Sequence, residues 1–400
     1  MTSAGAAVHP SQIMSSTDPL AILKDLVEAE SVTPDAGAAL DAFQRHCPGF
    51  SVERPVFEED GTAPVENLFA AIGTGAPHLT LAGHVDVVPP GEAALWSAPP
   101  FALTLRDGAA IGRGTADMKG GLAAMLAAVN RIQASGDALN GRISYLITGD
   151  EEGPAVNGTK KLLDWAVRRG ERFDACLLGE PTSVARIGDT VKNGRRGSFS
   201  ATLRVEGTQG HVAYPERADN PIRGLHVLLG ALLDPPLDAG SAFFQPSNLE
   251  PVSVDVGNPA TNVIPARAEA RFNVRFNDLW TPETLEAELR GRLERASDGR
   301  IRWVLLPRKD NSASFVTEGG AIVEAVIEAI EAETGLKPAL STGGGTSDAR
   351  FIKDYCPVVE FGLVGATMHM ADERIALADL ESLTAIYERA IRAFFAMERA

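Results

Sequence analysis

The first half of the chain alternates short apolar runs with amphipathic segments. Apolar residues recur at helical spacing in some segments, while others are brief runs rich in apolar and β-branched residues. Strands that alternate with helices in this way are typical of a mostly parallel sheet covered on both faces. The expected helices are residues 18–31, 121–135 and 160–170, and the expected strands are residues 67–73, 78–88, 142–153 and 173–181.

The pattern changes near Arg196. Residues 198–207 alternate apolar and polar side chains, which is typical of an antiparallel strand with one face in water. The order of elements that follows is β-α-β-β-α-β, the split pattern of a ferredoxin-like domain. Further strands are expected at 251–257, 266–277 and 301–307, and helices at 220–234 and 281–296.

From about Gly319 the first pattern returns, with a helix at 321–335, a strand at 358–362 and a long last helix. The predicted fold is therefore α/β, a mostly parallel mixed sheet flanked by helices, with an inserted ferredoxin-like α+β domain. We expect the first domain to cover residues 15–196 and 313–400 and the insert to cover 197–312. Residues 1–14 are expected to be a disordered extension, and Met14 is a candidate start.

Composition narrows the possible partners. The chain has 400 residues, which suits two domains, and 44% hydrophobic with 22% charged residues is a soluble globular balance. A formal net charge of -16 argues against nucleic acid and anionic membranes as partners. A basic cluster at Lys192, Arg195 and Arg196 is either a solvated turn or a local site for an anionic small molecule.

Targeting and redox signals point to the cytoplasm. The three cysteines are widely spaced and form no CxxC pair, so no disulfide framework is expected. The first residues lack the basic start and apolar stretch of a secretory signal. No apolar run reaches the ~18 residues of a membrane span. We therefore predict a cytoplasmic protein.

Five side chains that can bind metal ions stand where apolar runs end or where glycine-rich turns begin. In α/β proteins, sites form at such strand-to-loop transitions. Taken singly, Asp117 would suit a helix cap and His369 a structural role. Two imidazoles and three carboxylates together suit two divalent ions better than one, because a carboxylate can bridge two ions. The five candidates are His84, Asp117, Glu152, Glu180 and His369.

Two further acidic residues have predicted roles beside these ligands. Glu151 is adjacent to Glu152 in GDEEG and can face a water held by metal ions, which predicts a general base. Asp86 follows His84 by two residues, so both side chains point to one face of a strand. We expect the Asp86 carboxylate to accept a hydrogen bond from the free ring nitrogen of His84.

The motifs GHVDVVPPG, GRGTADMKGG, GDEEG, GEPT and the late MH together resemble the dinuclear zinc aminoacylase and metallopeptidase family. The resemblance extends from about residue 20 to the end. It implies a zinc-peptidase-like catalytic domain, an inserted domain that mediates dimerisation, and two Zn²⁺ per subunit, with Co²⁺ or another divalent ion as an alternative occupant. The segments 192–222, 262–281 and 341–352 look most like the desuccinylase branch of that family.

Position by position, the resemblance implies a role for each motif residue. Asp117 would bridge the ions, His84 and Glu180 would complete one site, and Glu152 and His369 the other. His211 resembles a histidine that the family presents to the neighbouring subunit's active site, which implies a homodimer. The implied succinyl-binding residues are Arg195, Tyr214, Asn262, Arg275, Gly345 and Thr346. One departure is Gly365, where that branch would have Asn.

The expected reaction is hydrolysis of N-succinyl-LL-2,6-diaminopimelate to succinate and LL-2,6-diaminopimelate, a step of lysine and diaminopimelate biosynthesis. Two arginines fit this substrate, because a guanidinium binds a terminal carboxylate with two parallel hydrogen bonds. The alternatives are another deacylase of the family, such as an acetylornithine deacetylase, and a glutamate-type exopeptidase. A catalytically silent metal-binding or amino-acid-binding protein is the alternative outside the enzymes.

Overall fold

The computed structural model describes residues 17–59, 61–136, 140–309 and 311–397, so the predicted extension at 1–14 lies outside the described residues. The chain divides into two compact units. The first consists of Met1–Asn193, Thr317–Ser341 and Ser347–Ala400, and the second of Gly194–Val316 and Thr342–Thr346. Each unit has its own hydrophobic core.

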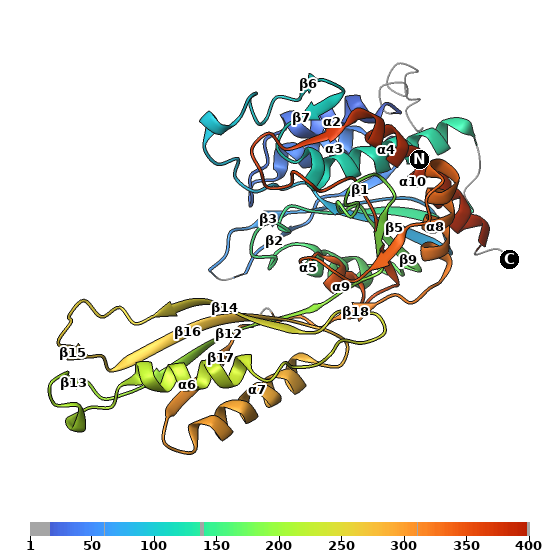
Figure 1. Ribbon diagram of the computed structural model, residues 1–400. Coiled ribbons are helices and arrows are strands. Elements are labelled where there is room, and N and C mark those ends of the chain that lie inside the picture. The colour runs from blue at the N-terminus through green and yellow to red at the C-terminus, as the bar shows by residue number, and fades with distance from the viewer. Residues whose placement is uncertain (1–16, 60, 137–139, 310, 398–400) are drawn as a thin grey trace. The chain divides into compact units, whose positions relative to one another are not determined.

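The first unit is built on a mixed eight-stranded sheet (Figure 1). Four neighbouring strands at its centre, β8, β5, β9 and β20, are parallel, while β1 pairs with β4, β4 with β8, and β10 with β20 in antiparallel fashion. In order across the sheet the strands are β1 (Ser51–Glu53), β4 (Leu68–Gly73), β8 (Arg142–Thr148), β5 (His78–His84), β9 (Ala175–Leu178), β20 (Val358–Glu360), β10 (Thr190–Lys192) and β19 (Ala339–Ser341).

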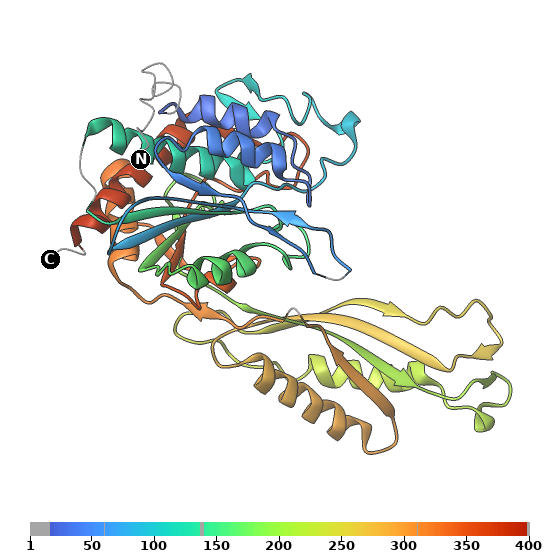
Figure 2. The same cartoon turned by 180° about the vertical axis from the view of Figure 1, so that it is seen from behind.

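Helices cover both faces of this sheet (Figures 1 and 2). Five of them share one core with the sheet: α2 (Pro19–Glu28), α3 (Gly37–Arg45), α4 (Gly120–Ser135), α8 (Ala321–Thr334) and α10 (Leu377–Met397). On the opposite face lie α5 (Thr159–Arg168) and α9 (Ala349–Ile352). The α/β architecture predicted from the alternating pattern is confirmed.

Short elements complete the first unit. A three-stranded sheet joins β21 (Arg374–Ala376), β7 (Ala109–Ile111) and β6 (Thr104–Arg106), and β2 (Val56–Phe57) pairs with β3 (Val65–Glu66). Two single turns are η1 (Ala93–Leu95) and η2 (Thr115–Lys119), of which η2 leads directly into α4.

Helix α4 lies unusually close to the central strands, and glycines make this possible. Strand β5 is buried along its whole length, as expected of a central parallel strand. A Cβ on Gly83 would collide with the side chains of Met118 and Leu122, and one on Gly121 with the carbonyl oxygen of Gly179. The small residues therefore allow η2 and the start of α4 to sit against the ends of β5 and β9.

The second unit is a four-stranded antiparallel sheet with the spatial order β14-β16-β12-β17 and two helices. In chain order the elements are β12 (Gly197–Glu206), α6 (Pro221–Leu233), β14 (Asn248–Asp255), β16 (Arg267–Phe276), α7 (Pro282–Ser297) and β17 (Arg302–Pro307). This is the split β-α-β-β-α-β arrangement. Strand β12 alternates buried and half-buried residues along its length, because one of its faces packs on the helices.

The second unit begins and ends a few residues outside the predicted insert of 197–312. Its first residues form β11 (Gly194–Arg195), which pairs with β18 (Phe315–Val316). It also includes the segment Thr342–Thr346, because Thr342 Oγ1 donates to the carbonyl of Phe243 at 2.8 Å. A small ladder of β13 (Gly210–His211) with β15 (Val263–Ile264), and the turn η3 (Pro215–Arg217), complete this unit.

Within the described ranges, no helix is long and apolar enough to cross a bilayer.

Candidate metal centre

Three of the predicted ligands come from neighbouring parallel strands of the first unit. His84 is the last residue of β5, Glu152 follows β8, and Glu180 follows β9. Strands β8, β5 and β9 are adjacent, so their carboxyl ends meet at the same edge of the sheet. The other two ligands come from loops: Asp117 lies in η2 ahead of α4, and His369 lies between β20 and β21.

The carboxylate of Asp117 lies between the two imidazoles. Its Oδ1 is 3.3 Å from Nε2 of His84, and its Oδ2 is 3.3 Å from Nε2 of His369. Each histidine also meets a second carboxylate: Glu180 Oε1 lies 4.0 Å from His84 Nε2, and Glu152 Oε1 lies 2.9 Å from His369 Nε2. The two oxygens of one aspartate thus face two separate histidine–glutamate pairs.

These contacts define two triads that share Asp117. In each triad, one donor atom from every residue lies within 4.8 Å of the others. A histidine nitrogen with two carboxylate oxygens is a suitable donor set for a catalytic zinc ion, which takes three protein ligands and keeps a fourth position open. The residues therefore fit two divalent ions. The triads are His84, Asp117 and Glu180, and Asp117, Glu152 and His369.

The electrostatics of the centre favour cations. Burial disfavours the charged form of His84, but its hydrogen bond to Asp117 and the charge of Glu180 outweigh burial and hold its pKa well above the usual value. Hydrogen bonds to Asp117 and Glu152 raise the pKa of His369 to about 10. The same negative potential that retains these protons would bind metal ions, whose binding displaces protons from the ligands.

Glu151 lies beside the ligands without belonging to either triad that contains Asp117. One of its oxygens lies within 4.8 Å of donor atoms of His84 and Glu152. Burial raises the pKa of Glu151 well above the usual carboxyl value, although the charge of His84 opposes this. Glu151 is therefore a carboxylate at the centre with an elevated proton affinity, the property required of a proton carrier.

Asp86 supports His84 through a different atom from the one expected. The Nδ1–H of His84 donates to the backbone carbonyl of Asp86 at 2.9 Å, while the nearest carboxylate oxygen is 3.7 Å away, too far for a hydrogen bond. The carboxylate instead accepts the backbone N–H groups of Glu151 and Glu152, at 3.3 and 3.0 Å. Asp86 thus orients the turn that carries both glutamates, because its carboxylate holds two backbone N–H groups of that turn.

His369 has a left-handed backbone conformation, with φ of +62°. This conformation is uncommon for residues other than glycine, and such residues cluster at functional sites. The side chain of His369 is half exposed, whereas His84 is fully buried. One triad is therefore open to solvent on its histidine side.

In the second unit, the predicted substrate residues fall into two groups. Arg195, the last residue of β11 and two residues before β12, donates to the carbonyl of Gly345 at 2.9 Å, and Arg275 pairs with Ser198 across β16 and β12. His211 and Tyr214 lie beyond the other end of β12, with their rings 5.7 Å apart. Asn262 joins them there, because its carbonyl accepts the N–H of Val212.

The two groups are far apart in a single chain. They lie at opposite ends of the ten-residue strand β12, a separation of roughly 30 Å. The half-buried Thr346 belongs to the segment of Gly345. One chain alone therefore does not gather all six predicted substrate residues around one ligand.

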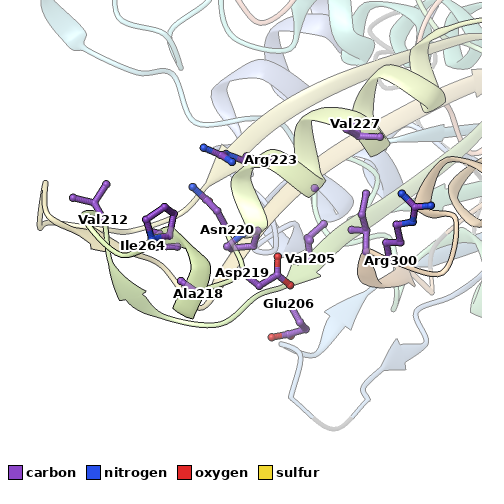
Figure 3. Close-up of a pocket in the computed structure, with 14 residues that line it drawn as sticks. Val205, Glu206, Val212, Ala218, Asp219, Asn220, Arg223, Val227, Ile264 and Arg300 are labelled. Atoms are coloured by element: carbon purple, nitrogen blue, oxygen red, sulfur yellow. The ribbon is translucent and has the colours of Figure 1, made fainter.

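A cavity of about 430 Å³ lies in the second unit, between the first turns of α6 and the end of β12 (Figure 3). Apolar side chains such as Val205, Val212 and Ile264 line it, together with charged ones such as Arg223 and Arg300. None of the predicted metal ligands or substrate residues is among its lining, although Val212 and Pro215 are the chain neighbours of His211 and Tyr214.

Comparisons with known proteins identify the family. The profile of peptidase family M20/M25/M40 matches residues 80–393. This chain belongs to that family. The succinyl-diaminopimelate desuccinylase of Methylobacterium nodulans is 60% identical to it over 380 residues, 94% of this chain and 96% of that protein. The enzyme of the same name from Methylorubrum populi is 59% identical over 385 residues, 96% of this chain and 100% of that protein.

Solved structures of the M20 family share the fold. The aminopeptidase PepT of Bacillus cereus superposes with a TM-score of 0.75 at 20% identity, over 95% of this chain and 99% of that one. The YXEP protein of Bacillus subtilis, described as a dinuclear metal-binding peptidase of the M20 family, gives a TM-score of 0.70 at 16% identity, over 97% and 99% of the chains. The predicted family membership and fold class are confirmed.

Several buried polar residues near the centre of this M20 chain were not predicted from the sequence. Arg113 and Glu373 form a buried ion pair next to Asp117, and Lys119 donates to the carbonyls of Leu26 and Ala29. A charged residue inside a glycine-rich turn, as in GRGTADMKGG, was the available signal for Arg113. Glu373, in the loop after His369, carried no comparable pattern.

Proposed function

We propose that this chain is a zinc-dependent amide hydrolase that converts N-succinyl-LL-2,6-diaminopimelate and water to succinate and LL-2,6-diaminopimelate. The observation that carries the proposal is the likeness, at 58–60% identity over nearly the whole chain, to proteins named succinyl-diaminopimelate desuccinylase. The two triads that share Asp117 supply a metal-binding arrangement consistent with that chemistry.

Two metal ions, when bound, polarise the amide carbonyl and lower the pKa of water. His84, Asp117 and Glu180 would hold one ion, and Asp117, Glu152 and His369 the other. Zinc suits these nitrogen and oxygen donors, and cobalt is an alternative occupant of the second position.

Glu151 is the proposed proton carrier. It accepts a proton as the oxygen of water forms a bond to the amide carbon, and it donates that proton to the amine nitrogen as the carbon–nitrogen bond breaks. One residue can perform both steps because the proton taken from water is the one that the leaving amine requires.

Arg195 and Arg275 are proposed to bind the terminal carboxylate of the succinyl group, with Gly345 and Thr346 beside them. A guanidinium can form two parallel hydrogen bonds to a carboxylate. An acetyl group has no such carboxylate, so these arginines would favour succinyl over acetyl substrates.

His211, with Tyr214 and Asn262, is proposed to act in the active site of a second subunit. All three lie at the far end of β12 from Arg195, roughly 30 Å away, which is too far for them to contact a small ligand held by Arg195 of the same chain. Val212 and Tyr214 are also exposed there, as residues that contact another subunit would be in an isolated chain. A homodimer would thus combine both groups.

We also propose a cytoplasmic location, which the three buried and free cysteines support.

The direct test of the function is an assay of purified enzyme on three substrates: N-succinyl-LL-2,6-diaminopimelate, N-acetylornithine and a short dipeptide. We expect the succinyl substrate to have the highest kcat/KM.

Arg195→Lys should lower kcat/KM for that substrate by about 10- to 100-fold, because a charge-assisted hydrogen bond contributes about 1.5–3 kcal/mol. The matched control is Arg196→Lys, since Arg196 binds Asn248 instead. A higher kcat/KM for the acetyl substrate or the dipeptide would identify this chain as another deacylase or an exopeptidase.

Replacing the proton carrier should stop turnover while leaving the metal ions in place. For Glu151→Gln we expect kcat to fall by about 10²- to 10⁴-fold, because the amide cannot accept the proton from water. Zinc content, measured by elemental analysis of the same sample, should be unchanged. The exposed Glu92→Gln serves as the control. Turnover retained by Glu151→Gln would exclude Glu151 from the role.

Mixing two inactive variants tests the shared active site. We expect Glu151→Gln and His211→Ala each to be inactive as homodimers. In a mixed dimer, one site combines an intact Glu151 with an intact His211 from the other subunit, so random mixing should restore about one quarter of the normal activity. If His211 served its own subunit, neither site of the mixed dimer would be complete and activity would stay absent.

A further inference from the structure

Arg113 and Glu373 are buried charges that the proposed mechanism does not use. Their side chains are 2% and 1% exposed, and Arg113 Nη1 lies 2.7 Å from Glu373 Oε2. A buried pair of this kind is weak evidence for a role in stability, because the free-energy cost of removing two charges from water can exceed the gain from their attraction. The location of the pair suggests another role.

The carboxylate of Glu373 holds the backbone that leads into Asp117. It accepts the N–H groups of Gly114, Ala116 and Asp117, at 2.9, 2.8 and 3.0 Å. With the bond from Arg113, each carboxylate oxygen accepts two hydrogen bonds. The conformation of the turn that carries the shared aspartate is therefore fixed by one side chain from a distant part of the sequence.

Arg113 connects the same point to the other ligand segments. Besides Glu373, its guanidinium donates to the carbonyl of Met370, the residue after His369, at 3.3 Å. It also donates to the carbonyl of Pro89, in the loop that follows His84 and Asp86, at 3.4 Å. Three chain segments that carry ligands thus meet at one ion pair.

Asp117 and His369 need such support more than the other ligands do. His84 and Glu180 stand at or within two residues of the ends of β5 and β9, and Glu152 lies in a short turn after β8 that the Asp86 carboxylate already holds. Asp117 and His369 lie outside the central sheet, and His369 has a left-handed backbone conformation. Their relative position depends on contacts between loops, and the ion pair supplies those contacts.

We propose that Arg113 and Glu373 are positioning residues that hold Asp117 and His369 at the separation needed to bind one ion together. The pair then determines chiefly the affinity of the triad Asp117, Glu152 and His369, since both loop ligands belong to it. The other triad has only one loop ligand and depends on the pair less. The inference rests on the proposed two-ion centre.

Zinc titration of the metal-free full-length protein by calorimetry tests this inference without an activity assay. We expect the parent to bind two equivalents and His369→Ala to bind one. In Glu373→Gln, an amide group replaces one of the oxygens that accept backbone N–H groups. We expect this change to weaken the affinity for one zinc equivalent by at least about tenfold and the affinity for the other equivalent less. Replacing a residue that hydrogen-bonds metal ligands typically has an effect of this size.

The matched control is Glu171→Gln. Glu171 accepts two hydrogen bonds from Arg142, at 2.9 and 2.6 Å, but this ion pair lies at the start of β8, away from the end that carries Glu152. We expect the control to bind both equivalents with the parent's affinities. Thermal melting in the presence of a chelator reports whether each metal-free variant is folded.

The outcomes separate this inference from the proposed function. A parent that binds fewer than two equivalents would contradict the two-ion centre itself. A parent and a Glu373→Gln variant that bind both equivalents equally well would overturn only the positioning role. If Glu373→Gln does not fold, Arg113→Lys takes its place, because a lysine cannot reach Pro89, Met370 and Glu373 together. The same selective loss is then expected, and normal binding of both equivalents would overturn the proposal.

Discussion

The position of one carboxylate, that of Asp117 between two imidazoles, is the constraint on which the candidate site depends. Its two oxygens lie at the same distance, 3.3 Å, from His84 and from His369. Without it, each half of the site would retain only one histidine and one glutamate. With it, each half has three donors, the number that a catalytic zinc ion takes from protein. The close packing of α4 against β5 and β9, which Gly83 and Gly121 permit, brings this aspartate to the strand ends.

The fold and three of the ligands follow from local patterns in the sequence. Apolar runs ending in His84, Glu152 and Glu180 predict strands, and the carboxyl ends of adjacent parallel strands must meet at one edge of a sheet. The alternation in β12 likewise predicted an antiparallel sheet with one covered face. Asp117 and His369 lie in loops, where periodicity carries no information about distance. They were included because five possible ligands occur together at strand-to-loop transitions, and the family resemblance then implied which ion each would hold.

Long-range polar contacts were the part that the sequence did not disclose. The expected contact of Asp86 with His84 used the wrong atom, because the Asp86 carboxylate accepts the backbone N–H groups of Glu151 and Glu152, which are distant in the sequence. The ion pair of Arg113 with Glu373 joins residues 260 positions apart, which no local pattern can indicate. The separation of Arg195 from His211 follows from the strand expected at 198–207, which the structure confirms as β12.

The most direct test of the central claim is a crystal structure of the zinc-loaded protein, with anomalous differences recorded at the zinc absorption edge. We predict two peaks roughly 3.5–4 Å apart. One should lie next to His84 and Glu180, the other next to Glu152 and His369, with the Asp117 carboxylate between them. A single peak, or two peaks that Asp117 does not join, would contradict the account.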